Sequence, residues 1–207
     1  MLELASYGAR VVHPRAVELG ELFNIPILVA SSFTQSPGTL IHGGECMEVR
    51  NKVKGIAHDL DVAKVTVVGV PDRTGIAATI FQPLAKAGIS VDTIVQNASI
   101  QNITDLTFTV TKSDLKRAME VIKPIAKSVG AKECVGDSRL GKVSIIGTGM
   151  LDTPGYAARM FTALGEKGIN IQLITTSEIR ITCIVDEARV KDAVGALHQA
   201  FELDIEE

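Results

Sequence analysis

The alternation of hydrophobic and polar positions follows the same course twice along the chain. Val65 and Val67 alternate with more polar neighbours, and β-branched residues predominate around them, which predicts a strand. Further on, apolar residues recur every three to four positions, as at Ile80 and Leu84, which predicts a helix with one buried face. The same change of period begins again at Val143. The pattern therefore predicts two copies of one structural unit.

The two copies also match residue by residue. The segment 64–69, Lys-Val-Thr-Val-Val-Gly, corresponds to 142–147, Lys-Val-Ser-Ile-Ile-Gly, at an offset of 78 positions. At an offset of 80, five identities pair Gly75, Phe81, Leu84, Gly88 and Ile89 with Gly155, Phe161, Leu164, Gly168 and Ile169. Because similarity at a fixed period reveals repeated architecture, the elements of one copy predict those of the other.

Each copy is predicted to run strand, helix, strand, strand, helix, with one further strand to complete its sheet. The later elements are expected at 89–97, 106–110 and 113–128 in the first copy, and at 169–176, 179–185 and 187–201 in the second. This order is typical of a ferredoxin-like βαββαβ unit. The predicted fold class is therefore α+β, with two such modules.

The final strand indicates how the copies are joined. Residues 131–136 can complete the first copy, whereas the second copy ends before another strand is formed. Residues 50–59 are compatible with a strand that the first copy does not need, so we expect them to complete a discontinuous second module. The expected domains are a head at 1–45, a strand for the second module at 46–60, the first module at 61–137 and the second module at 138–207.

The head lies outside the repeat. It predicts a short helix at 2–7, a helix from His13-Pro14 to about Phe23, and an unbroken apolar run at 27–31. Such a run is typical of a strand buried on both faces of a parallel sheet, which this chain does not supply. We therefore expect the head to be the end of another domain, either partly mobile or packed against a second copy of the chain.

Composition excludes several classes of function. With 207 residues and 46% hydrophobic content, the chain can bury two modest cores. The net charge of −3 and the absence of tryptophan disfavour nucleic-acid binding, and no apolar run is long enough to predict a membrane span. Three widely spaced cysteines, Cys46, Cys134 and Cys183, predict neither a disulfide framework nor a metal motif, which favours a reducing cytoplasm.

Two turns that join a strand to a helix are candidate ligand sites. Residues 71–75, Pro-Asp-Arg-Thr-Gly, and 150–155, Met-Leu-Asp-Thr-Pro-Gly, each precede a helix whose unpaired N–H groups can hold a carboxylate. The plainer interpretation is a capped turn, with Asp72 or Thr74 capping the first helix and Thr153 the second.

Polar residues at the ends of strands are further candidates. Gln96 and Asn97 are poor strand formers, so their amides can bind an ammonium or hydroxyl group, cap the next connection, or bond to another chain. Glu178, in the equivalent segment of the second copy, suits a cationic ligand or is a solvated strand residue. The four histidines share no ligand spacing, and no catalytic constellation is expected.

These motifs together resemble the tandem ACT domains of aspartate kinase. The likeness rests on Val-Pro-Asp-Arg-Thr-Gly at 70–75, Val-Gln-Asn-Ala-Ser at 95–99, Gly-Thr-Gly-Met at 147–150 and Thr-Thr-Ser-Glu-Ile-Arg at 175–180. Residues 1–15 resemble the segment that closes the family's catalytic domain. The resemblance implies an enzyme that phosphorylates L-aspartate with ATP and Mg²⁺ on the way to lysine, threonine and methionine, of which this chain is the feedback-inhibited regulatory part.

The resemblance also implies what the chain lacks and with what it assembles. The family's aspartate- and nucleotide-binding segments precede the part matched here, so no catalytic residue, cofactor, metal or autonomous kinase activity is expected in this chain. The expected partners are a threonine or lysine effector, a second copy paired through the ACT modules, and a full-length aspartate kinase subunit, because some members make the regulatory part separately. Neither nucleic acid nor a membrane is expected as a partner.

Carried over position by position, the family's effector residues fall into two groups. A threonine-type site falls on Asp72, Gly75, Ala77, Gln96 and Asn97, with Asn170 and Ile171 of the other module. A site that resembles the family's lysine pocket falls on Met150, Thr153, Ser177 and Glu178. Some members have His where Thr153 stands and Thr where Ala157 stands, so the sequence favours threonine sensitivity over lysine sensitivity.

Two other functions are compatible with the same fold. One is a sensory subunit of a different biosynthetic enzyme, such as acetolactate synthase, that binds a branched-chain amino acid, although the kinase-like head argues against it. The other is a dimerisation scaffold in a ligand-insensitive enzyme. In the preferred hypothesis, modules pair side by side across a dimer, and the effector lies between a turn of one module and strand residues of its neighbour.

Overall fold

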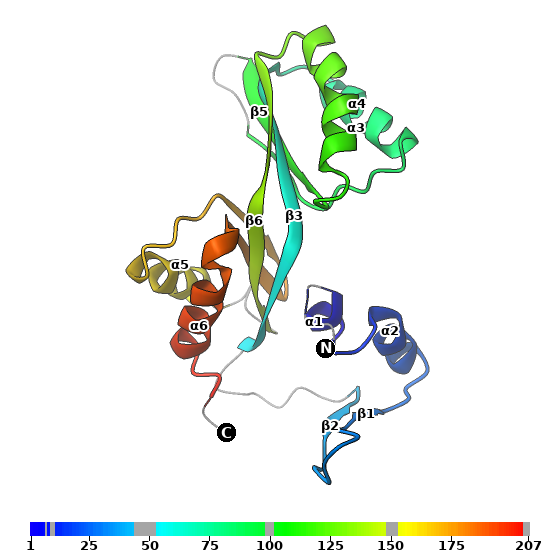
Figure 1. The fold of residues 1–207 in the computed structure, drawn as a ribbon, viewed down its shortest axis with the longest axis vertical. Coiled ribbons are helices and arrows are strands. Elements are labelled where there is room, and N and C mark those ends of the chain that lie inside the picture. Colours follow the sequence, from blue (N-terminus) through cyan, green and yellow to red (C-terminus); the bar gives the residue numbers. More distant parts are fainter. Residues whose placement is uncertain (7, 9–10, 44–52, 98–101, 148–152, 205–207) are drawn as a thin grey trace. The chain divides into compact units, whose positions relative to one another are not determined.

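The computed structural model describes residues 1–6, 8, 11–43, 53–97, 102–147 and 153–204 (Figure 1). The chain forms two compact units. The first-module unit comprises Leu60–Lys142 and Val185–Ala188, and the second-module unit comprises Met1–Asp59, Val143–Ile184 and Arg189–Glu207. The predicted discontinuity of the second module is confirmed, because the segment before the first module belongs to the same unit as Val143–Ile184.

The first-module unit is an antiparallel sheet with two helices. Its strands follow the order β4-β5-β3-β6, and β5 pairs antiparallel with both β3 and β4. The elements are β3 (Val53–Pro71) from Leu60 onward, α3 (Ile76–Lys86), β4 (Ile94–Gln96), β5 (Ile103–Val110), α4 (Leu115–Ser128) and β6 (Glu133–Gly147) up to Lys142. Helices α3 and α4 lie against each other on one face of this sheet (Figure 1).

The core of the first-module unit lies between the sheet and these two helices. Val65 and Val67 of β3 alternate with less buried neighbours, as the sequence predicts for a strand with one covered face. The rings of Phe81 on α3 and Phe108 on β5 meet edge to face, with centroids 5.3 Å apart and planes at 72°. The helices contribute Ile76, Ile80, Leu84, Ala118, Ile122 and Ala126.

The second-module unit contains a similar sheet and the head. Within this unit the strands follow the order β3-β6-β8-β7, and the head adds a separate pair, β1-β2. The elements are α1 (Leu2–Ser6), α2 (Pro14–Leu22), β1 (Ile27–Val29), β2 (Thr39–Ile41), β3 up to Asp59, β6 from Val143, α5 (Tyr156–Glu166), β7 (Leu173–Ser177), β8 (Arg180–Asp186) and α6 (Val190–Ala200). A short 3-10 helix, η1 (Glu187–Arg189), connects β8 to α6.

Helices α5 and α6 bury the apolar face of the second sheet. Met160 and Leu164 of α5 and Leu197 of α6 are fully buried. The thiol of Cys183 on β8 lies 4.0 Å from the sulfur of Met160, so the inward side chains of β8 touch α5 directly. Tyr156 and Phe201 stack with ring centroids 6.2 Å apart, which joins the start of α5 to the end of α6.

The head lies against the other face of the second sheet. Ile146 follows Ile145 along β6 and therefore faces away from the helices, toward the head. Leu4 of α1 packs over Gly55 of β3, where an added Cβ would lie 3.1 Å from it. Helix α2 begins as predicted at Pro14, and His13 Nδ1 accepts a hydrogen bond from the Arg15 N–H at 3.2 Å.

Two sets of predicted strands have different bounds in the structure. Each of β3 and β6 is one continuous strand, although the sequence predicted separate strands on either side of residues 60–63 and 137–141. Conversely, the strand predicted at 89–97 is regular only in β4, because Ile89 closes the end of α3 through a hydrogen bond from its N–H to the Leu84 carbonyl.

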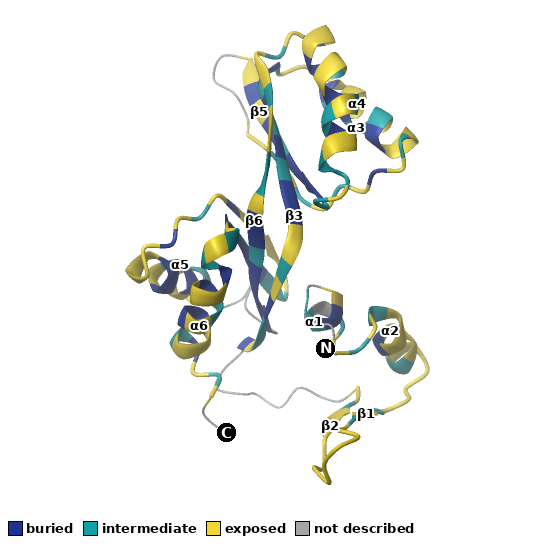
Figure 2. Cartoon of the chain, viewed as in Figure 1, coloured by how far each residue is buried: buried dark blue, intermediate teal, exposed yellow. Residues whose placement is uncertain are grey.

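The apolar run of the head is not buried on both faces in the described part of the chain. Strand β1 pairs antiparallel with β2 alone, and most of the surface of this pair is exposed or intermediate (Figure 2). Leu28 is 61% exposed and Phe33 is 96% exposed. A pair of strands of this kind is marginally stable in isolation. Within the described residues, no helix has the length and apolar character that crossing a membrane requires.

Candidate functional site

The predicted site of the first module has two halves, the turn after β3 and the residues at the end of β4. The strand register brings both halves to one end of the sheet. The start of β5 pairs with the ends of both neighbouring strands: Thr104 lies opposite Val70 of β3, and Leu106 lies opposite Gln96 of β4. The turn after β3 and the residues after β4 therefore emerge together. Asp72 and Gln96 belong to these two segments, and both are exposed.

Three hydrogen bonds from the start of β5 hold this end of the first module. The Asp72 N–H donates to the Asn102 carbonyl at 2.8 Å, and the Thr104 hydroxyl donates to the Asn97 carbonyl at 2.5 Å. The Gly69 N–H donates to Asp105 Oδ1 at 2.8 Å, where the register of β3 shifts between Val67 and Val70. The segment Asn102–Asp105 thus contacts both halves of the predicted site.

The N-terminus of α3 opens at the same end. Gly75 precedes the helix with φ +85°, a left-handed conformation that favours glycine, and no side chain caps the first turn. The predicted caps Asp72 and Thr74 are therefore wrong, because the chain makes a further turn, from the Arg73 carbonyl to the Ile76 N–H, before the helix begins. Ala77 stands partly buried in the first helical turn. Free N–H groups at such a terminus favour an anion.

The second module repeats this arrangement with a shorter connection. Ser177 at the end of β7 lies opposite Arg180 of β8, so only Glu178 and Ile179 form the turn between the two strands. The Gly147 N–H donates to the Ile179 carbonyl at 2.9 Å, which ties this turn to the end of β6. Ser177 and Glu178 are both exposed.

Helix α5 also begins behind a left-handed glycine. Gly155 has φ +110° and occupies the N-cap position of α5, which starts at Tyr156, so the predicted N-cap at Thr153 is wrong. The backbone turns again at 154–155 before the helix begins, as it does before α3. Thr153 is partly buried, and Met150 of the predicted group lies outside the described residues.

Asn170 and Ile171 lie at the opposite end of the second module from Ser177 and Glu178. They precede β7, where the Gln172 N–H donates to the Ile184 carbonyl at 2.8 Å. The turn with Glu178 comes after the other end of the same strand. Within this module the two groups are therefore not brought together, and the assignment of Asn170 and Ile171 to the threonine-type site stays a prediction.

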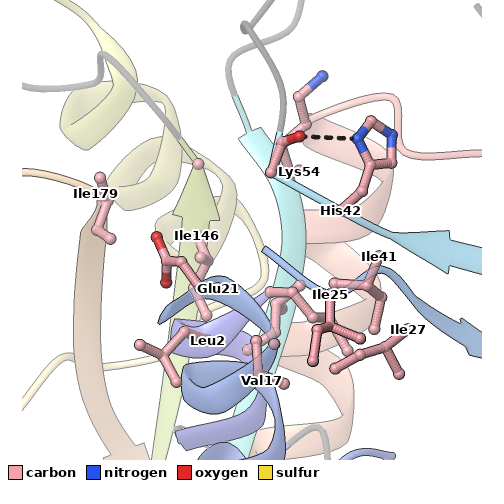
Figure 3. A pocket seen from close by; sticks show the side chains of 15 residues that line it. Leu2, Val17, Glu21, Ile25, Ile27, Ile41, His42, Lys54, Ile146 and Ile179 are labelled. Atoms are coloured by element: carbon pink, nitrogen blue, oxygen red, sulfur yellow. Dashed lines mark hydrogen bonds between the residues drawn. The ribbon is translucent and has the colours of Figure 1, made fainter. Parts of the chain in front are cut away.

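The second-module unit also contains an apolar cavity of about 380 Å³ between the head and the sheet (Figure 3). Its walls are Leu2, Val17, Ile25, Ile27 and Ile41 of the head and Ile146 and Ile179 of the module, with Glu21, His42 and Lys54 as the ionisable groups. Among the predicted site residues that the structure describes, none lines this cavity. Glu178 immediately precedes the lining residue Ile179 in the sequence.

Sequence comparison assigns both repeats to one domain class. Residues 64–126 match the family description "ACT domain", and residues 143–201 match a second family of the same description. The chain is therefore a tandem ACT-domain protein. The left-handed glycine turns and the strand ends described above lie at corresponding ends of its two ACT modules.

Relatives of known activity extend the assignment. The chain is 46% identical over 206 residues to the aspartokinase of Pseudomonas aeruginosa, which covers 99% of this chain and 50% of that protein. The solved regulatory subunit of aspartate kinase from Thermus thermophilus, in its ligand-free form, is 41% identical with a TM-score of 0.69 over 72% of this chain and 99% of that one. A structure of aspartokinase alpha and beta subunits is 43% identical with a TM-score of 0.69, and the match covers 73% of this chain and 99% of that one.

This chain belongs to the aspartokinase family and corresponds to its regulatory ACT region. It spans about half the length of the curated relatives it matches. The resemblance inferred from the motifs at 70–75, 95–99, 147–150 and 175–180 is thereby confirmed.

Proposed function

We propose that this chain is the feedback-inhibited part of an aspartate kinase and that its first module binds free threonine. The observation that carries the proposal is the junction at one end of that module, where the Asp72 turn, the open N-terminus of α3 and the Gln96–Asn97 strand end meet at the start of β5. The kinase reaction itself, phosphoryl transfer from ATP to L-aspartate, belongs to the catalytic half of the full-length relatives and comes to this protein as part of the proposal.

The chemistry of this junction suits an α-amino acid. The N–H groups of the first turn of α3 bind the carboxylate, since a helix N-terminus carries partial positive charge. The carboxamide oxygens of Gln96 and Asn97 accept hydrogen bonds from the ammonium group or from a side-chain hydroxyl. Gln96 and Asn97 are exposed and Ala77 in the first turn of α3 is partly buried, so a ligand reaches this end of the module without opening the core.

The second module supports a site for a cationic amino acid. Exposed Glu178 stands in the turn that is tied to the end of β6, exposed Ser177 ends the strand before it, and α5 begins behind a left-handed glycine as α3 does. A lysine ligand places its carboxylate on such a terminus and its side-chain ammonium on a carboxylate. We therefore propose lysine as the effector of this module, second to threonine at the first.

Self-association through the module edges is part of the proposal. Strand β4 bonds only to β5 and β7 only to β8 among the described strands, so each presents an unpaired edge. Ile94 on β4 is 53% exposed and Ile174 on β7 is 44% exposed. Exposed apolar side chains on open edges favour pairing with another chain. We propose a homodimer, or a complex with a full-length aspartate kinase subunit, that covers these edges.

Calorimetric titration of the 207-residue chain tests the effector assignment. Threonine is expected to bind, and Gln96→Ala is expected to weaken it about tenfold or more, because one hydrogen bond to a charged group contributes about 1.5–3 kcal/mol. Gln199→Ala, an identical truncation at an exposed position of α6, serves as the control and is expected to leave the affinity unchanged.

The ligand panel distinguishes the alternatives. Threonine, lysine, valine and methionine are each titrated separately, and threonine and lysine are also titrated together. Binding of valine without binding of threonine or lysine favours a sensory subunit of another pathway, and no binding in any of the five titrations favours a ligand-insensitive scaffold. When the chain is joined to its catalytic part, threonine is expected to inhibit kinase activity, with a coupling free energy of about 1–3 kcal/mol.

A further inference from the structure

We infer that Thr104 and Asp105 are positioning residues that set the effector affinity of the first module without touching the effector. The inference rests on the proposed function of that module. Its basis is the contact of the Thr104 hydroxyl with the Asn97 carbonyl at 2.5 Å and of Asp105 Oδ1 with the Gly69 N–H at 2.8 Å.

Thr104 anchors the strand half of the site. Its side chain is 5% exposed, and it donates to a carbonyl seven positions earlier in the chain. That carbonyl belongs to Asn97, directly after Gln96, where the regular pairing of β4 has ended. The hydroxyl therefore replaces a strand hydrogen bond at the position where the chain leaves the sheet, and it fixes the direction in which Gln96 and Asn97 continue.

Asp105 anchors the turn half. Gly69 stands at the irregularity of β3 with φ +68°, and its N–H points to the Asp105 carboxylate. An extra residue in one strand bends that strand and increases its local twist, so this contact sets the course of residues 70–75. The Asn102 carbonyl then accepts the Asp72 N–H, so the short segment Asn102–Asp105 contacts both halves of the site.

In the second module a main-chain carbonyl, instead of a side chain, binds the N–H of the corresponding glycine. Gly147 corresponds to Gly69 in the repeat, and its N–H is bound by the main-chain carbonyl of Ile179. The turn between β7 and β8 contains two residues and places that carbonyl directly. Between β4 and β5 the connection, 97–102, is longer, and side chains of β5 take over the bond. The geometry of the first site therefore depends on the identity of residues 104 and 105.

Thr104→Val tests the inference, because valine keeps the shape and strand preference of threonine and removes only the hydroxyl. In calorimetric titration of the full chain with L-threonine, we expect affinity about two- to tenfold weaker than wild type, the range of one neutral hydrogen bond. Thr104→Ser restores the hydroxyl and is expected to recover most of the affinity. A purely packing role predicts the reverse order, with valine closer to wild type than serine.

Thr107→Val is the matched control. Thr107 lies three positions further along β5, opposite Thr66 of β3 and Val95 of β4, and its hydroxyl pairs with that of Thr66 at 3.1 Å. We expect this variant to bind threonine as wild type does. Asp105→Ala provides a second test at an exposed position, where removal of the acceptor is expected to weaken binding by a similar factor and Asp105→Asn to restore it, since its amide oxygen still accepts the Gly69 N–H.

The outcomes separate this inference from the proposed function. If wild type binds threonine and both Thr104→Val and Asp105→Ala bind it equally well, the positioning role is wrong and the effector site stands. If wild type binds none of the amino acids tested, the proposed function fails and this inference fails with it. Equal weakening by Thr107→Val also overturns the inference, because the effect then reflects general loosening of β5.

Discussion

The hydroxyl oxygens of Ser144 on β6 and Thr182 on β8 lie 2.7 Å apart, and both side chains are buried. The two hydroxyl groups form a hydrogen bond with each other in the interior of the second-module unit. Ser144→Ala is expected to lower the free energy of unfolding by about 1–3 kcal/mol, because it leaves the Thr182 hydroxyl without its partner. Chemical denaturation monitored by circular dichroism measures the change.

The double variant provides the check on this prediction. Ser144→Ala with Thr182→Val removes both polar groups, and it is expected to be less destabilised than the sum of the single variants. Ser90→Ala changes an exposed serine and is expected to stay within about 0.5 kcal/mol of wild type. Strict additivity of the two buried changes contradicts the paired role of the hydroxyls.

The left-handed glycine before α3 provides a second prediction. Gly75 has φ +85°, and an added Cβ meets no heavy atom within 4 Å, so Gly75→Ala introduces backbone strain without a clash. We expect a loss of about 1–2 kcal/mol in unfolding free energy, together with weaker threonine binding. Gly195→Ala, in the interior of α6 with equally open surroundings, is the control and is expected to stabilise the chain by about 0.5–1 kcal/mol.

The fold was largely predictable because the repeat presents every element twice. Gly88 and Gly168, for example, end corresponding helices, and both have the positive φ that such an end requires. The continuous strands were missed because Asp59-Leu60-Asp61 has the polar character of a loop. In the structure, however, these residues continue the backbone of β3. The helix caps were missed because Thr74 and Thr153 have the side chains of a cap, whereas the glycines after them make an extra turn.

The candidate site was predictable only in part. Asp72, Gly75, Gln96 and Asn97 were found from their motifs, and the register of β5 brings their segments to one end of the module. Thr104 and Asp105 were not found, because in a strand pattern they are ordinary polar positions. Their partners lie seven and 36 positions away, so their role emerges only when the strands are paired.

Cys183 makes stability depend on pH in the alkaline range. Burial raises the pKa of its thiol from 9.0 to about 12. The folded state then holds the proton more tightly than the unfolded state, so the stabilisation is complete below pH 9 and is lost as the pH rises toward 12. In that interval unfolding free energy is expected to fall by up to about 1.4 kcal/mol per pH unit, and Cys183→Ala is expected to remove this contribution.

Thiol labelling provides an independent measurement of the same environment. In a Cys46→Ser background, Cys183 is expected to resist iodoacetamide at pH 8 until the chain is unfolded, because the thiolate is the reactive form. Cys134 is only partly buried, and burial also raises its pKa, with Lys123 opposing the shift. It is therefore expected to react slowly but faster than Cys183. If Cys183 is labelled faster than Cys134 in the folded chain, the result contradicts the buried position of Cys183.

The attachment of the head gives a prediction about Gly8. With φ +122°, this residue lies so close to β3 that an added Cβ would be 1.9 Å from the His58 carbonyl oxygen. Gly8→Ala is therefore expected to detach α1 from the sheet and to speed cleavage of the head by trypsin. Gly43→Ala is the control, because its added Cβ has no neighbour nearer than 3.8 Å. Equal cleavage of the two variants shows that the contact does not hold the head.

The continuous strand β3 limits where a gene for this region can be divided. Val53–Asp59 belongs to the unit that contains Val143–Ile184, although it precedes the entire first module in the chain. An open reading frame that starts at Leu60 encodes every later element yet leaves the second sheet one strand short. A separately translated form that keeps both modules must therefore begin upstream of Val53, and shorter reading frames are expected to yield insoluble or rapidly degraded protein.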